Sequence, residues 1–314
     1  FGLLPFSNIG YSYSNTKALN STDGSTSVVK ATNTYSGTGG LHQVYLGLGW
    51  SPFKGFAIGV NAAYLWGDYS RSVINSYTDA YANTLSKYYT AEVHNYKLDF
   101  GMQYTQKITK NDAITLGVTY GLGHKLSSDP KCQIISTNAQ TAVADTATYS
   151  IGNGLELPHS YGVGLMWNHA NRWRVGADYT LQKWSSVAYP KFDTSTNSYE
   201  LVSGQFADRH KMTVGGEFCP DERSRNFFKR VHYRMGASYA TDYLKIKGQN
   251  GPKEYSVSAG FGIPIVNGYN NRSLLNISAQ WVRQGSKTFV TENSFRINIG
   301  LTFNERWFAK WKME

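Results

Sequence analysis

Apolar and polar residues alternate with a period of two along most of this chain, and residues 160–182 show the pattern most clearly. Every second residue from Tyr161 to Trp167 is apolar, and Gly162, Gly164 and Met166 fall between them. A polar break at 169–172 follows, after which the alternation resumes. Period-two alternation is typical of strands, and two such runs joined by a short polar segment predict a β-hairpin.

The same alternation recurs along the chain and predicts about twelve strands. The predicted strands cover residues 1–13, 44–50, 56–66, 98–104, 114–122, 161–168, 173–181, 212–218, 231–239, 255–263, 275–281 and 295–303. Many approach the ~9–11 residues that a tilted strand needs to cross a bilayer. The apolar face of the hairpin at 160–187 begins and ends in aromatic residues, as in the girdles of membrane barrels.

The predicted connections differ in length at the two ends of the strands. Turns near residues 52, 110, 170, 222 and 268 are mostly short, whereas we expect long polar loops at 15–40, 67–87, 126–156 and 188–204. Short turns at one end and long loops at the other are typical of outer-membrane barrels. A soluble β-sandwich, the alternative, has no reason to keep its long loops at one end.

Composition limits how the chain can enter a membrane. No run approaches the ~18–20 apolar residues of a membrane helix, and the mean hydropathy is −0.41. Only helices and closed barrels satisfy every backbone group in lipid, which leaves the closed barrel. The net charge is +10, but Lys and Arg are dispersed over strand ends, turns and polar faces. This favours a solvated surface, or contact with anionic outer-membrane lipid or lipopolysaccharide, over nucleic acid.

The first strand carries an interruption at Pro5, Phe6, Ser7 and Asn8. Proline cannot donate a hydrogen bond to a sheet, so the segment predicts a kink, bulge or gap in pairing. The chain begins at Phe1, already inside a strand, without a signal peptide. We therefore expect the start of the protein to lie upstream.

Several blocks of residues resemble the FadL-type family of outer-membrane long-chain fatty-acid and hydrophobic-compound transporters, in its Bacteroidota-like branch. The similarity covers most of the chain from Gly55 onward. The blocks are Leu157-Pro158, Gly162, Gly164, Trp173, Asp178-Tyr179, Trp184-Ser185, Asp208-Arg209, Gly215-Gly216-Glu217-Phe218, Arg234-Met235-Gly236 and Gly260-Phe261-Gly262-Ile263-Pro264.

The resemblance implies a fourteen-stranded barrel whose lumen is plugged by an N-terminal hatch. Residues 1–314 would then form one barrel domain that lacks the hatch and the first two strands. Residues 1–13 would be the third strand, which in this family kinks inward and opens the wall toward the bilayer. Pro5–Asn8 is then the candidate lateral opening, although the same residues could mark a tolerated bulge.

Strand parity places charged residues of both signs toward the lumen. Opposite charges on neighbouring strands are expected to pair, so the first interpretation is an ion network that stiffens the barrel. The second is a site for a ligand carboxylate, which Arg and Lys suit. The inward candidates are Lys97, Asp99, Arg174, Asp178, Lys211, Glu217, Arg234 and Arg296.

No catalytic or metal motif is recognisable. The seven histidines lack metal-site spacing, and Cys132 and Cys219 are too few for a disulfide framework and should lie at opposite ends of the barrel. Asp208-Arg209-His210 lacks the context of a hydrolase motif. The sequence therefore predicts no cofactor, no metal and no enzymatic activity.

Two functions remain open. The first is passive diffusion of fatty-acid-like molecules or lipids across the outer membrane of a Gram-negative cell, with lateral exit and extracellular long loops. The second is a structural or accessory subunit of a multiprotein outer-membrane complex for secretion, nutrient uptake or barrel assembly, whose partners are other outer-membrane proteins. In either case residues 304–314, with Trp307, Phe308 and Trp311, suit a periplasmic interfacial tail.

Overall fold

The computed structural model describes residues 1–19, 28–246, 248–266, 272–285 and 291–302, and most of them lie in strands. The predicted interfacial tail at 304–314 lies outside these residues. In chain order the elements are β1 Gly2–Leu19, β2 Val29–Phe53, β3 Phe56–Tyr77, β4 Thr84–Lys107, β5 Asp112–Gly121, β6 His124–Leu126, β7 Lys131–Thr137, β8 Ala144–Ser150, β9 Leu155–Leu157, β10 Ser160–His169, β11 Trp173–Gln182, η1 Trp184–Ser186, β12 Tyr189–Asp193, β13 Ser198–Val202, β14 Arg209–Phe218, α1 Phe227–Arg230, β15 His232–Ala240, β16 Lys245–Ile246, β17 Gln249–Asn250, β18 Lys253–Val266, β19 Arg272–Gly285 and β20 Glu292–Thr302.

The main sheet is an antiparallel meander in which each strand pairs with the next long strand along the chain. Its order is β1-β2-β3-β4-β5-β10-β11-β14-β15-β18-β19-β20, and β7 and β8 join it through β4. This order confirms the predicted strands and the all-β barrel architecture. The expectation of two further strands stays a prediction.

The apolar rows face outward, as a membrane barrel requires. In β10, Val163 and Leu165 are 46% and 51% exposed, whereas the glycines between them line the inside of the curved sheet. A soluble sandwich would bury this row in its core. The outward row therefore confirms the barrel over the sandwich.

The predicted difference between the two ends is present, but two predicted loops are wrong. Residues 54–55 and 170–172 make tight connections at one end. At the other end, most of the expected loop at 15–40 belongs to β1 and β2. Likewise β3 and β4 fill most of the expected loop at 67–87. The long connections at 126–156 and 188–204 contain short hairpins of their own.

The outer face of β2 changes character at His42. On the side toward the short turns, the outward residues are Val44, Leu46, Leu48 and Trp50. On the side toward the long connections, they are Thr38, Ser36, Thr34, Thr32 and Lys30. His42 lies beside Trp66 of β3, with ring centroids 5.9 Å apart, while Phe53 stacks on Phe56 at the other end of the apolar row. Aromatic rings at both edges of an apolar strip mark the two interfaces of a bilayer. We call this strip, and the wall level with it, the membrane band.

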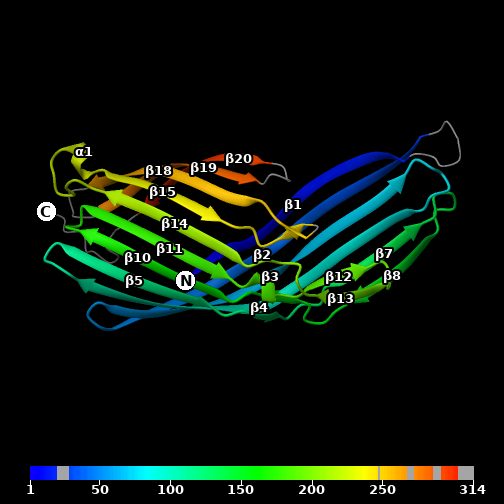
Figure 1. The fold of residues 1–314 in the computed structure, drawn as a ribbon, viewed down its shortest axis with the longest axis horizontal. Helices are drawn as coiled ribbons and strands as arrows, with labels where there is room; N and C mark the ends of the chain where they lie inside the picture. The colour runs from blue at the N-terminus through cyan, green and yellow to red at the C-terminus, as the bar shows by residue number, and fades with distance from the viewer. Residues whose placement is uncertain (20–27, 247, 267–271, 286–290, 303–314) are drawn as a thin grey trace, which may run out of the picture.

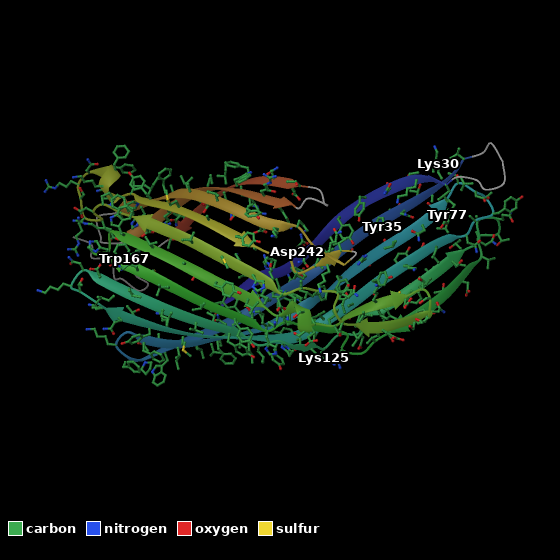
Figure 2. The ribbon with its side chains drawn as sticks, in the orientation of Figure 1. Lys30, Tyr35, Tyr77, Lys125, Trp167 and Asp242 are labelled. Carbon is green, nitrogen blue, oxygen red and sulfur yellow. The ribbon has the colours of Figure 1, made fainter. Side chains whose placement is uncertain are left out.

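Beyond the membrane band, four strands continue as a curved extension that we call the platform. It comprises residues 9–19 of β1, 29–40 of β2, 67–77 of β3 and 84–93 of β4, together with β7 and β8. Figure 1 shows β1–β4 running past the ends of the other strands, toward β7 and β8 and away from α1. Lys30, Tyr35 and Tyr77 lie in this extension, far from Trp167 (Figure 2).

Most of the buried side chains lie at the long-connection end of the molecule. Leu65 and Val93 are fully buried there, beneath residues of the long connections. Val187 and Phe206 of the connection between β11 and β14 are also buried. The long connections therefore form a packed cap beside the rim of the barrel. No helix in the described part of the chain is long and apolar enough to cross a membrane.

Candidate functional sites in the wall and the lumen

The interruption in β1 is a β-bulge at Phe6. Pro5 pairs with His42 and Ser7 with Leu41, which leaves Phe6 without a counterpart on β2. The Ser7 hydroxyl oxygen accepts a hydrogen bond of 3.1 Å from the Leu41 backbone N–H. A bulge adds one residue to one strand and sharpens the local bend and twist. Here it lies just below the platform.

Glycines on β2 and β3 let the backbones approach closely at the level of this bulge. A Cβ on Gly40 would lie 2.4 Å from the Ser7 carbonyl oxygen, and one on Gly67 would lie 2.3 Å from the carbonyl oxygen of Gly40. Gly39 has a φ of +106°, which L side chains rarely adopt. The sheet therefore bends along a line through β1, β2 and β3. That Pro5, Phe6, Ser7 and Asn8 open the wall stays a prediction.

Glu217 is the centre of an ion network on the inner wall. Its Oε1 accepts a hydrogen bond of 3.1 Å from Arg174, and its Oε2 accepts one of 2.6 Å from Arg234 Nε. Arg234 also donates to Asn276 at 2.6 Å, and His232 Nδ1 lies 3.2 Å from Glu217 Oε1. The network joins β11, β14, β15 and β19, and the contact between Arg234 and Asn276 reaches across the intervening strand β18. Two arginines share one carboxylate, so their positive charge is only partly balanced.

The other inward candidates do not join this network. Lys97 pairs with Asp99 on the same strand, β4. Asp178 lies over Gly164, where a Cβ would meet its Oδ1 at 2.2 Å. The structure shows no ion pair for Lys211 or Arg296 among the described residues. The candidate set thus separates into one cross-strand network and several single charges.

The inner wall is rich in glycine and carries more polar groups than the outer wall. One hollow of about 570 Å³ is lined on β5, β10, β11 and β14 by Thr119, Gly164, Arg174, Asp178 and Glu217. A second, of about 680 Å³, is lined by glycines together with Asn61, Asp99 and Gln103. Apolar hollows occur instead on the outer face, for example beside Leu48, Trp50, Phe100 and Met102. The described wall thus offers polar groups to the lumen and apolar groups to the bilayer.

Asp208 joins the two ends of the connection between β11 and β14 at the rim of the barrel. Its Oδ2 pairs with Lys183, and its Oδ1 accepts a hydrogen bond of 3.0 Å from the Ser185 N–H. Burial alone would raise the pKa of Asp208, but these partners hold that pKa at about 2. His210 instead contacts the Tyr179 hydroxyl at 2.7 Å. Asp208 and His210 therefore do not form the acid–base pair of a hydrolase.

Aromatic rings pack directly above Asp208. Trp184 stacks on Tyr243 at 4.5 Å between centroids and contacts Phe206 at 5.8 Å. The rings come from η1, from the segment before β14 and from the segment after β15. The cap is thus fixed by an ion pair below and an aromatic cluster above. Sequence reasoning did not find this cluster, because Tyr243 lies on a different connection from Trp184 and Phe206 and no motif links the three.

Three potential metal ligands come together at the short-turn end. Single donor atoms of Cys219, Glu222 and His232 all lie within 4.8 Å of one another. Sequence reasoning missed this group because the histidines lack metal-site spacing and the two cysteines were set aside as uninformative. The signal is the hairpin register, since Phe218 pairs with Tyr233 and so places Cys219 opposite His232. Both cysteines are free, and Cys132 lies at the other end, in β7.

Comparison with solved structures gives the class of this protein, which is that of outer-membrane β-barrels with the FadL-type fold. The CymD monoaromatic hydrocarbon channel matches with a TM-score of 0.59 and 12% identity, over 96% of this chain and 88% of that chain. The P. putida toluene transporter TodX matches with a TM-score of 0.53 and 12% identity, over 95% and 82%. A Pseudomonas aeruginosa FadL homologue matches with a TM-score of 0.53 and 13% identity. This match covers 82% of this chain and 66% of that chain.

At such low identity these matches show the shared fold alone, and at that level they confirm the resemblance drawn from the sequence. The BamG family model matches residues 1–314. The chain therefore belongs to the BamG family. No curated protein matches the chain.

Proposed function

We propose that this protein is an accessory subunit of a larger outer-membrane protein assembly and that the platform is its contact surface. The long connections and the platform then face the cell exterior. The observation that carries the proposal is the length of β2, which has 25 residues. A bilayer crossing needs only ~9–11, so more than half of this strand serves another purpose.

The platform has the chemistry of a surface that stands in water and contacts protein. On β2 its outer face carries Lys, Ser and Thr, which a lipid-facing strand would not carry. Its inner face exposes Tyr11 at 40% and Tyr13 at 58%, and Tyr13 stacks on Tyr35 at 5.0 Å between centroids. Tyrosine is enriched at protein interfaces because it combines a large apolar ring with a polar end.

The lumen supports the same proposal. A conduit for greasy molecules needs apolar contacts along its path, whereas the described inner wall presents glycines, Thr119, Asp178 and the Glu217 network. The cap of aromatic rings and ion pairs is packed as a structural core rather than as an open mouth. The ion pairs of Arg174 and Arg234 with Glu217 link neighbouring strands and so stiffen the barrel wall.

Site-specific photo-crosslinking in native membranes tests the proposal. A photoreactive residue at Tyr13 faces the exposed inner side of the platform, whereas one at Thr34 faces its outer side. We expect discrete crosslinks to protein from Tyr13 and few from Thr34. A barrel that purifies alone in mild detergent, with no crosslink from either position, would contradict the subunit function.

The second candidate is a channel for hydrophobic small molecules that leave laterally at the bulge. Two observations favour it: the fold is shared with the CymD monoaromatic hydrocarbon channel, and β1 carries a bulge at the predicted position. CymD and TodX are named as a channel and a transporter, which supports a non-enzymatic role. The ligand would be fatty-acid-like, and Arg174, Lys211, Arg234 and Arg296 are the residues to meet its carboxylate.

Replacing Pro5–Asn8 with three β-branched residues in regular register tests the channel. The change removes the bulge and should abolish uptake of a labelled fatty acid while the barrel still folds. The matched control replaces Tyr11–Ser14 with four β-branched residues, which alters the platform but leaves the bulge. Equal uptake by the bulge-free variant and the parent would contradict lateral exit of the ligand at the bulge.

A further inference from the structure

We propose that Cys219, Glu222 and His232 bind a divalent transition-metal ion of the Zn²⁺ type at the short-turn end of the barrel. A thiolate, an imidazole and a carboxylate form a three-ligand set that leaves a fourth, tetrahedral position for water. Their donor atoms already lie within 4.8 Å of one another. Cys219 is buried, His232 is half-buried and Glu222 is exposed, so an ion could enter from the Glu222 side.

The local fold holds this group in place before any ion arrives. The Cys219 N–H donates to the Arg172 carbonyl oxygen at 2.9 Å, which ties the turn to the neighbouring hairpin. Within the turn, the Asp221 N–H donates to the Lys229 carbonyl oxygen, also at 2.9 Å. Asn226 caps α1 by accepting a hydrogen bond from Phe228. A turn fixed at both ends keeps the three side chains on one side of the hairpin.

His232 has the partner that a metal-binding histidine usually has. Its Nδ1 lies 3.2 Å from Glu217 Oε1, yet this buried atom makes no well-aligned hydrogen bond in the structure. A ligating histidine commonly donates its other ring N–H to a carboxylate, which orients the ring and raises its basicity. Glu217 is itself held by Arg174 and Arg234, so it would serve as the orienting group and not as a ligand.

The charge around Cys219 favours a cation. The carboxylate of Glu222 lies within 4.8 Å of the Cys219 thiol and supplies a negative charge beside it. The Sγ lies 3.7 Å from the Arg230 carbonyl oxygen and 3.8 Å from that of Lys229, as a weak thiol donor. Binding of the ion would release the thiol proton to solvent, and the ion would then neutralise thiolate and carboxylate together.

Titration of the metal-stripped, full-length barrel in detergent with Co²⁺ alone tests the site, with Zn²⁺ stoichiometry as a second measurement. We expect one ion per chain and a thiolate-to-Co²⁺ charge-transfer absorption. Cys219→Ser should abolish the absorption, and His232→Gln should weaken binding by at least about tenfold. Cys132→Ser is the matched control, because it removes the other buried thiol at the far end, and it should leave the absorption unchanged.

Absence of the absorption, or its persistence in Cys219→Ser, would overturn the proposal. Binding that no change at the three residues affects would likewise show an adventitious ion only. If Cys219→Ser fails to fold, as judged by heat-dependent gel mobility, Glu222→Gln decides the matter. That position is exposed and its substitution spares the core, so unchanged affinity in Glu222→Gln would also contradict the site.

Discussion

One strand, β2, passes through two environments, and its outer face records both. Between Val44 and Trp50 every outward residue is apolar, and Leu48 and Trp50 are each 65% exposed. Between Lys30 and Thr38 every outward residue is Lys, Ser or Thr. Pairing with β3 continues through both regions without a break at His42, although the bulge of β1 lies opposite this residue. The backbone ladder therefore forms the sheet, and the side chains alone decide which part of it lies in lipid.

Strands on the opposite side of the barrel lack the second region. β10, β11 and β14 have 10 residues each, which is close to the ~9–11 residues that a tilted strand needs to cross a bilayer. Their upper ends lead instead into the connections that build the cap. The rim of the barrel therefore differs from side to side: long strands extend beyond it on one side, and packed connections cover it on the other.

The largest difference in stability between the membrane band and the platform should appear when an outward residue of β2 is replaced by arginine in each region. Leu46→Arg places a charge near the middle of the apolar row and should destabilise the barrel by about 2–4 kcal/mol. Thr34→Arg lies on the same face of the same strand but in water, and should change stability by less than about 0.5 kcal/mol. Urea unfolding in lipid vesicles measures both. Equal costs at the two positions would mean that the boundary at His42 is misplaced.

The next largest effect should come from the bend that separates the two regions. A Cβ at Gly39 would lie 2.4 Å from the Asp68 carbonyl oxygen, and the residue has a φ of +106°. Gly39→Val should therefore cost about 1–3 kcal/mol and loosen the platform before the membrane band. Hydrogen exchange should show faster exchange in the platform. Gly10→Val is the control, since no atom lies within 4 Å of its added Cβ.

The boundary also explains which parts of the structure the sequence could predict. Wherever one face meets lipid, as in residues 161–167, alternation is strong and the strands were predicted correctly. Residues 29–40 are also a strand, but they carry polar residues on most positions because both faces meet water or tyrosine. Without an apolar face the pattern resembles a loop, and the pairing comes from the backbone and the neighbouring strands.

The sites were harder to predict for a related reason. The alternation of inward and outward residues along each strand allowed the Glu217 network to be anticipated. Arg174 and Arg234 lie directly opposite Glu217 in the strand register. The cap and the Cys219 group depend on how separate connections fold over one another. Such contacts follow from tertiary packing, which alternation alone does not encode.

A smaller effect is expected at the rim, where Asp208 fastens the cap to the barrel. Its pKa falls from 3.8 in the unfolded chain to about 2 in the fold, so its contribution is complete above about pH 4. It is lost as the pH falls through about 2. Asp208→Asn should therefore cost about 1 kcal/mol at neutral pH, after allowance for solvent screening. Unfolding followed against pH should show a weaker acid dependence in the variant than in the parent.

The smallest effect on stability and the clearest one on function are expected at Tyr13. Its ring is 58% exposed and stacks on Tyr35, so Tyr13→Ser should change the free energy of unfolding by less than about 1 kcal/mol. If the platform contacts another protein, the same change should weaken co-purification of the partner in mild detergent. Phe295→Ser is the matched control, since it removes an aromatic ring that is 68% exposed on the outer face of the membrane band. Loss of stability without loss of a partner would mean that the tyrosines serve the sheet itself, and the platform would then be an internal support.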